Sequence, residues 1–303
     1  MNDLALLILN YNSFDDTISC AKRLLSFGKD YHIIIVDNCS TDNSYVMLKE
    51  ALGNEEFVDV LKTDYNSGYS AGNNFGIRYA AEKYRISFIA IVNPDVIIPD
   101  VTVIENLVKK LLKNDSLGII TGVALTHDKK FNISTSGWTL PNTIDLIIGH
   151  SILGNGNKTQ NEYFNFLGDG LIQVDCVAGC FFIAKERILS EIGYFDENVF
   201  LYNEENILGI KCRNKGYIEA IDLTQPYIHN HVQKKQKVSF KSKINATKNS
   251  YKSRKYLCKK YYSSKVLPFL WIIEVINVFV LFLSYLKQRI NYMGIRKGKN
   301  ANQ

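Results

Sequence analysis

Residues 32–44 read HIIIVDNCSTDNS, and this stretch decides the fold. Its first half is an apolar run rich in β-branched residues that ends in Asp37, which predicts a buried strand. Its second half is polar and supplies capping residues for a helix over 44–52. A strand that ends in a polar loop and leads into a helix is the repeating unit of an α/β protein.

The same unit recurs along the first third of the chain. Further apolar runs of strand length cover 4–10, 57–63 and 87–95. Helix-like stretches lie between and after the strands, over 15–27, 44–52, 71–84 and 101–113. Runs that are apolar on both faces suit a parallel sheet with a helix layer on each side. The alternation therefore predicts an α/β fold with a doubly wound, mostly parallel sheet and right-handed crossovers.

The ends of the predicted strands are polar and rich in Asn, Asp and Gly. They read NYN (10–12), DNCSTD (37–42), YNSGYSAGNNFG (65–76) and NPD (93–95). In doubly wound sheets, ligands bind beyond the carboxyl ends of the strands. None of these ends carries a G-x-G-x-x-G or a P-loop, which argues against dinucleotide dehydrogenases and P-loop NTPases. Amides and carboxylates suit a nucleotide whose phosphates carry a metal ion.

The charge of the chain is divided sharply between two regions. Residues 232–303 hold 17 Lys and Arg and one acid, Glu274, although the net charge of the whole chain is only +6. Residues 1–231 are therefore acidic. We expect a catalytic domain over 1–231 and a separate basic helical region over 232–303, whose own partner is anionic lipid or nucleic acid.

An apolar stretch within the basic region points to the membrane. Residues 266–286 read VLPFLWIIEVINVFVLFLSYL, which is long enough to span a bilayer, but Glu274 and Asn277 make a span costly. We favour a helix lying in the plane of an anionic membrane surface. A core or homodimer helix and a true span stay open as alternatives. The region has no recognised nucleic-acid motif, so we expect no nucleic-acid partner.

Seven motifs, in order, resemble the family 2 glycosyltransferases of the GT-A fold, within their bacterial rhamnosyltransferase-like branch. They are ILNYN, IIIVDNCSTDNS, NSGYSAGNNFGI, IVNPD, VDCVAGCFFIAKE, IGYFDENVFLYNEE and IHNH. The resemblance runs from about residue 4 to residue 231. It implies inverting transfer of a sugar from a nucleotide-diphosphate donor to an acceptor hydroxyl in polysaccharide assembly. With the membrane helix, it implies a lipid-linked acceptor at the cytoplasmic face of the plasma membrane.

The resemblance also assigns roles to residues. Asp95 would hold Mg²⁺ or Mn²⁺ on the donor diphosphate, and His229 or His231 would meet the ion or the diphosphate. Asp175 and Gly179 would border the acceptor. The expected donor pocket contains Asn10, Tyr11, Asn12, Asp37, Asn66, Gly68, Asn73, Asn74, Asn93 and Asp95.

The general base is expected in the stretch LYNEENILGIKCRNKGY, residues 201–217. Adjacent acids in a first helical turn are often partners of the helix dipole. The resemblance implies that Glu205 is the base and that Glu204 positions it or touches the acceptor. Asn93, which replaces the first acid of the family's D-x-D motif, departs from the family pattern, as do Ile207 and Lys211. They keep open an alternative, a catalytically inactive protein of the same fold that binds nucleotide-sugars or acts as a scaffold.

Overall fold

A computed structural model describes residues 3–28, 31–125, 130–149, 165–230 and 239–300, with side chains up to residue 287. The chain divides into two compact units. The described residues up to 140, together with 165–230, form the first. Residues 141–149 and 239–300 lie in the second. The helical unit, expected from residues 232–303 alone, therefore also takes in a segment from the middle of the chain.

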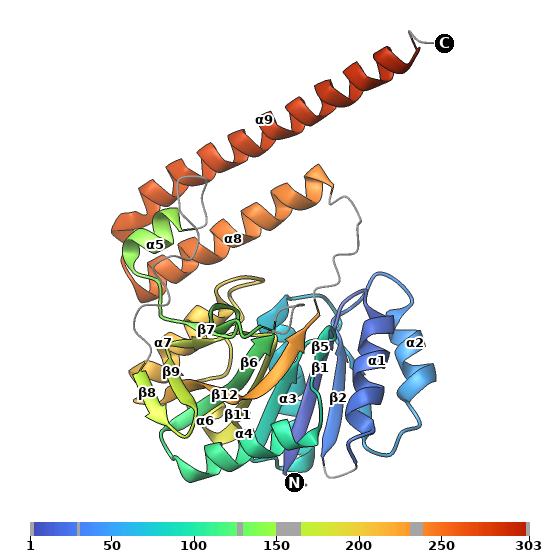
Figure 1. Ribbon diagram of the computed structural model, residues 1–303, viewed down its shortest axis with the longest axis vertical. Helices are drawn as coiled ribbons and strands as arrows, with labels where there is room; N and C mark the ends of the chain where they lie inside the picture. The colour runs from blue at the N-terminus through green and yellow to red at the C-terminus, as the bar shows by residue number, and fades with distance from the viewer. Residues whose placement is uncertain (1–2, 29–30, 126–129, 150–164, 231–238, 301–303) are drawn as a thin grey trace. The chain divides into compact units, whose positions relative to one another are not determined.

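The first unit is built on a mixed sheet with helices on both faces (Figure 1). Over the described residues the sheet has ten strands in the order β3-β2-β1-β4-β11-β6-β12-β9-β8, with β5 paired to β12 and a separate pair formed by β7 and β10. The strands are β1 (Leu4–Asn10), β2 (His32–Asp37), β3 (Val58–Lys62), β4 (Phe88–Val92), β5 (Val96–Ile97), β6 (Leu117–Leu125), β7 (Gly137–Trp138), β8 (Asn165–Gly168), β9 (Leu171–Val174), β10 (Cys176–Val177), β11 (Phe181–Lys185) and β12 (Ile218–His229).

The expected parallel half of the sheet is confirmed. Strands β1 to β4 pair in parallel, and β6 pairs in parallel with β12. β11 lies between these two groups and runs antiparallel to both β4 and β6. The carboxyl ends of the parallel strands and the start of β11 therefore meet at one edge of the sheet.

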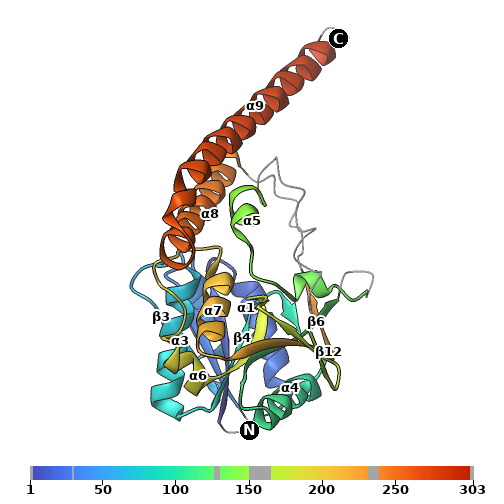
Figure 2. The ribbon, with the colours of Figure 1, turned by 90° about the vertical axis from the view of Figure 1, so that its left-hand side faces the viewer.

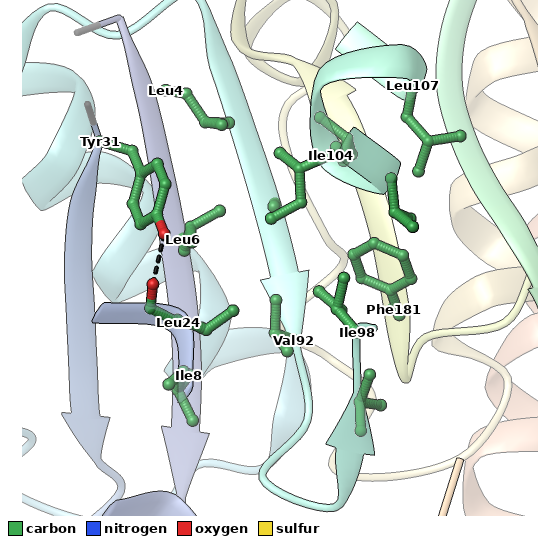
Figure 3. Packing of buried hydrophobic residues seen from close by; sticks show 14 of the residues in the cluster. Leu4, Leu6, Ile8, Leu24, Tyr31, Val92, Ile98, Ile104, Leu107 and Phe181 are labelled. Atoms are coloured by element: carbon green, nitrogen blue, oxygen red, sulfur yellow. Dashed lines mark hydrogen bonds between the residues drawn. The ribbon is translucent and has the colours of Figure 1, made fainter. Parts of the chain in front are cut away.

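Two helix layers cover the sheet (Figures 1 and 2). One face packs against α1 (Phe14–Leu25), α2 (Ser44–Leu52) and α4 (Val101–Lys113), and the other against α3 (Tyr69–Tyr84), α6 (Glu186–Glu191) and α7 (Glu204–Asn214). Alternate residues of β1 pack against the helix layers on opposite faces of the sheet. Leu6 and Ile8 lie in the first core (Figure 3), whereas Ala5 and Leu7 lie in the second. This is the two-sided burial that the apolar runs predicted.

The second unit is helical. It contains α5 (Thr143–Ile148), α8 (Phe240–Tyr261) and α9 (Leu267–Asn300), which extends beyond α8 in Figure 1. The α5 helix begins with a capping box, in which the Asn142 side chain accepts from the Asp145 N–H and Asp145 accepts from the Asn142 N–H. The Tyr262 hydroxyl donates to the Pro141 carbonyl at 2.8 Å. This bond ties the end of α8 to the start of the inserted segment.

Glycines let α3 pack directly on the central strands. A Cβ on Gly72 would lie 2.6 Å from Leu9 Cδ1, and a Cβ on Gly76 would lie 2.4 Å from Leu7 Cδ1. Real side-chain carbons do not approach so closely, so a larger residue must displace the strand or the helix. The glycine spacing of the sequence thus sets the distance between α3 and the sheet.

We expect Gly76→Ala to lower the free energy of unfolding by about 1–2 kcal/mol. Overpacking against Leu7 and Val36 costs about 1–3 kcal/mol, and the better helix propensity of alanine returns up to about 1 kcal/mol. Urea unfolding measures the change. Glu82→Ala, at an exposed position of the same helix, should change the free energy of unfolding by less than about 0.5 kcal/mol. Equal stability of Gly76→Ala and the wild type would contradict the packing argument.

Candidate active site

The first two strands end in a buried polar pair. β1 and β2 place Asn10 opposite Asp37, and neither residue is exposed. The Asn10 amide donates to Asp37 Oδ1 at 2.8 Å, and the Ser40 hydroxyl donates to the same oxygen at 2.5 Å. Because a buried carboxylate needs such donors, Asp37 fixes the loop that follows β2. Direct contact of Asp37 with a donor nucleotide stays a prediction.

Tyr11 and Asn12 lie at the rim beside this pair. Asn12 has a left-handed backbone, with φ of 53°. Its Oδ1 accepts from the Thr41 N–H at 2.8 Å, and its Nδ2 donates to Thr41 Oγ1 at 3.0 Å. These bonds join the loops that follow β1 and β2. Tyr11 is 46% exposed, so its ring is accessible to a ligand at this edge.

Asn66 and Gly68 shape the turn into α3. Asn66 Oδ1 accepts from the Gly68 N–H at 2.9 Å and from Asn38 Nδ2 at 3.1 Å. Gly68 has φ of 94°, and a Cβ there would lie 2.0 Å from the Phe200 carbonyl oxygen. Only glycine fits this conformation and this approach. The turn therefore also fixes the loop that leads into Glu204.

Asn73 and Asn74 lie deeper than the sequence suggested. Both are fully buried in α3. Asn74 accepts from the Phe195 N–H at 3.0 Å and donates to the Phe195 carbonyl at 3.0 Å and to Glu197 at 2.8 Å. Asn73 donates to the Tyr69 carbonyl at 2.9 Å. These bonds hold the 195–197 loop against α3. Donor binding by Asn73 and Asn74 stays a prediction.

Asp95 and His229 lie side by side beyond β4. His229 Nε2 is 3.4 Å from Asp95 Oδ2, and the Asn230 N–H donates to the Asp95 carbonyl at 2.9 Å. Burial lowers the pKa of His229, but hydrogen bonding to Asp95 and Cys180 outweighs it and raises the pKa to about 10. The imidazole is therefore a cation beside an accessible carboxylate. His231 lies outside the described residues.

Glu204 and Glu205 open α7 after two left-handed residues. Tyr202 has φ of 72° and Asn203 has φ of 66°. Consecutive non-glycine residues in this region store strain, which is common at functional sites. Glu204 is 6% exposed, and its Oε2 has no hydrogen-bond partner in the described structure. Glu205 is half-buried and accepts from the Gly179 N–H at 3.3 Å.

The two carboxylates differ in their readiness to ionise. Burial raises the pKa of both, and the charge of Glu205 raises the pKa of Glu204 further, well above its usual value. Glu204 therefore keeps its proton when Glu205 has lost its own. Glu205 is the less buried member of the pair and the one whose carboxyl group is contacted by a backbone N–H.

Gly179 and Cys180, just before β11, lie between Glu205 and the turn that holds Asp95. The Cys180 carbonyl accepts from the Asn93 N–H at 2.8 Å, next to Asp95. A Cβ on Gly179 would lie 2.9 Å from Glu205 Oε1 and 3.0 Å from the Tyr69 hydroxyl. Tyr69 donates that hydroxyl to the Gly179 carbonyl at 2.6 Å. Tyr69 was not among the predicted site residues, although it directly follows Gly68.

Asp175, unlike Gly179, has contacts with Leu140 and Arg213 and not with Glu205. Its Oδ2 accepts from the Leu140 N–H at 2.8 Å, and its Oδ1 is 3.7 Å from Arg213. It lines a cavity of about 140 Å³ together with Arg213 and the buried Glu219. Of the two residues expected to border the acceptor, the structure places Gly179 beside Glu205 and gives Asp175 a role in anchoring the chain at Leu140.

Known proteins resemble the chain both in sequence and in fold. The model of the family described as Glycosyl transferase family 2 matches residues 6–190. The low-salt glycan biosynthesis hexosyltransferase Agl10 of Haloferax volcanii is 26% identical over 236 residues, which cover 76% of this chain and 68% of that protein. This relative is haloarchaeal, so the bacterial rhamnosyltransferase-like branch stays a prediction.

Solved glycosyltransferases share the fold. The mannosyltransferase PcManGT of Pyrobaculum calidifontis, in complex with GDP-Man and Mn²⁺, superimposes with a TM-score of 0.58 at 12% identity, covering 88% of this chain and 68% of that one. GalNAc-T7 with UDP, GalNAc and Mn²⁺ gives a TM-score of 0.52 at 12% identity, covering 75% of this chain and 43% of that one. These likenesses establish the expected GT-A fold. With the family model matching more than half of its length, the chain belongs to glycosyl transferase family 2.

Proposed function

We propose that this protein transfers one sugar, with inversion, from a nucleotide-diphosphate donor to a hydroxyl of a saccharide acceptor. The acceptor is lipid-linked, and the product enters a cell-surface polysaccharide assembled at the cytoplasmic face of the plasma membrane. Support for sugar transfer comes from the family and from a relative named as a glycan biosynthesis hexosyltransferase. The acceptor and location rest on the basic, apolar helical region.

One observation carries the proposed chemistry. The Gly179–Cys180 segment contacts Glu205 on one side and the Asn93 turn, next to Asp95, on the other. The Glu205 side chain thus lies near the Asp95–His229 pair, at the edge of the sheet where the parallel strands end. Inverting transfer needs both, a base for the acceptor hydroxyl and charge compensation for the leaving diphosphate.

Glu205 accepts the proton of the acceptor hydroxyl in this proposal. The Gly179 N–H holds its Oε1 in place, and the absence of a Cβ on Gly179 leaves room for that approach. Glu204, buried and protonated, limits the negative charge behind the base. The acceptor oxygen attacks the anomeric carbon as the bond to the diphosphate breaks on the opposite face.

Asp95 and His229 fit a metal ion only when the donor supplies further ligands. The described residues contain no set of three His, Cys, Asp or Glu side chains that could hold an ion alone. One carboxylate and one imidazole, completed by diphosphate oxygens and water, suit Mg²⁺ or Mn²⁺. When bound there, the ion would neutralise charge on the departing diphosphate. Binding would require His229 to release its proton.

Two of the three departures that motivate the inactive alternative, Ile207 and Lys211, make structural contacts. Ile207 is fully buried among the core residues of α7. The Lys211 ammonium donates to the carbonyls of Gly193 and Tyr194. These two departures from the family pattern therefore serve packing of α7 and its neighbouring loop, and neither removes Glu205 from the site.

Glu205→Gln should lower kcat by about 10²–10⁴-fold without unfolding the protein, because an amide of the same shape cannot accept the proton. Glu204→Gln should have a smaller effect, since that acid is already neutral. Donors and lipid-linked acceptors are screened by mass spectrometry of the product. Glu105→Gln, at an exposed pair with Lys109, is the control. Full turnover by both Glu205→Gln and Glu204→Gln would show that the base lies elsewhere.

The pH dependence of kcat/KM gives an independent check. Burial raises the pKa of Glu205 above the usual 4.5, and only its ionised form accepts a proton. Activity should therefore fall as the pH falls, and the loss should begin at a higher pH than for an ordinary glutamate. An acid limb at the ordinary value, or one that persists unchanged in Glu205→Gln, would speak against Glu205.

Chelation of divalent ions should abolish transfer, and Mn²⁺ or Mg²⁺ should restore it. Asp95→Asn should raise the metal concentration needed for half-maximal activity by at least about tenfold, because it removes a charged ligand. Calorimetry of Mn²⁺ binding in the presence of the nucleotide diphosphate provides a second readout. Asp115→Asn, whose side chain is fully exposed, is the matched control. Full activity in excess chelator would refute the metal assignment.

A further inference from the structure

The helix α9 presents a long apolar face to its surroundings. Trp271 is 62% exposed and Phe279 is 58% exposed. Within the stretch Ser264–Lys287, the most apolar 18-residue window has a mean hydropathy of 2.5, and only 17% of that window is buried. A soluble core helix would be mostly buried. The exposed apolar side chains of this face are Phe269, Trp271, Ile272, Val275, Ile276, Phe279, Phe282, Leu283 and Leu286.

The opposite face of α9 packs on α8 and holds its polar residues. The Lys255 ammonium donates to Glu274 Oε2 at 2.7 Å. The Asn277 amide donates to the Tyr251 hydroxyl, and Asn277 is 8% exposed. The two groups that make a membrane contact costly for α9 are thereby turned away from its apolar face and satisfied by α8.

The α8 helix accompanies α9 along most of the apolar stretch. Lys255 meets Glu274 near one end, and the Phe240 ring stacks on Tyr285 near the other, with ring centroids 4.3 Å apart. The two helices are therefore antiparallel. α8 carries eight Lys and Arg and no acid. A transmembrane α9 with α8 attached would carry these charges into the hydrocarbon, so the pairing argues against a span.

Four exposed lysines form a stripe along α8. They recur at intervals of seven, four and seven residues, which keeps them on one side of a helix. Lys252 and Lys259 are the helical neighbours of Lys255, which contacts α9. The stripe therefore runs along α8 beside the line of contact with α9. It consists of Lys241, Lys248, Lys252 and Lys259.

We propose that α8 and α9 form a two-helix wedge that lies in the plane of an anionic bilayer surface. The apolar face of α9 enters the boundary between headgroups and acyl chains, to a depth of about 5–10 Å. The lysine stripe of α8 meets the lipid phosphates. An anionic bilayer is preferred to a second copy of the chain, because anionic lipid complements a helix α8 that carries eight Lys and Arg and no acid. The proposal concerns binding and does not depend on the assignment of Glu205.

Depth-dependent quenching tests the orientation of α9. The chain has two tryptophans, so Trp138→Phe with Trp271→Phe and Phe279→Trp leaves one reporter in the middle of the apolar stretch. The full-length variant is added to phosphatidylglycerol vesicles whose lipids carry bromine at shallow or deep acyl positions. We expect stronger quenching by shallow bromine. Stronger quenching by deep bromine would establish a span, and no quenching with a dimer in sedimentation would establish self-association. Either result overturns the proposal.

Charge reversal tests the lysine stripe. Lys248→Glu with Lys252→Glu should weaken flotation with phosphatidylglycerol vesicles by at least about tenfold, since each lysine near the surface contributes to binding. Lys109→Glu with Lys113→Glu, on exposed positions of α4, makes the same change in net charge and should weaken binding much less. Equal losses in the two variants would overturn the proposal. Turnover of a water-soluble acceptor should be the same in the stripe variant, which separates this test from the catalytic one.

Discussion

The site depends on the antiparallel direction of β11. Parallel strands bring to the carboxyl edge only the residues that follow them, such as Asn93 and Asp95 after β4. β11 runs the other way and brings the residues that precede it, Gly179 and Cys180. Its pairing with β4 sets these two backbone units against the Asn93 turn, and the missing side chain of Gly179 lets Glu205 approach. β11 therefore fixes the position of Glu205 relative to Asp95.

Adjacent acids acquire different chemistry because a helix turns between them. Successive residues point about 100° apart around the axis. At the start of α7 this rotation sends Glu204 into the protein and leaves Glu205 half-buried, where the N–H of Gly179, just before β11, donates to it. The helix dipole accounts for acids in a first turn. It does not account for an unpartnered, buried carboxylate oxygen on Glu204, which is costly unless the group stays neutral.

Local pattern predicted the elements of the parallel half, because apolar runs and capping residues act over a few positions. The predicted helices at 44–52 and 101–113 coincide with α2 and α4. The roles of single polar residues were harder to predict. Asn66 and Asn74 look alike in the sequence, yet Asn74 bonds to residues more than a hundred positions away. Tyr69 is likewise placed by a bond to Gly179, more than a hundred positions away, and Asp175 by contacts with Leu140 and Arg213, which no local pattern encodes.

The inserted helix α5 gives the second unit an unusual order of assembly. Leu146 is buried there, and Tyr262 reaches back to Pro141 across more than a hundred residues. During synthesis, the segment around α5 leaves the ribosome long before α8 and α9 exist. The apolar side of α5 therefore stays exposed to solvent while the catalytic unit folds. The second unit folds last, although its first residues are synthesised in the middle of the chain. A nascent chain arrested before residue 240 would leave the apolar side of α5 exposed to chaperones.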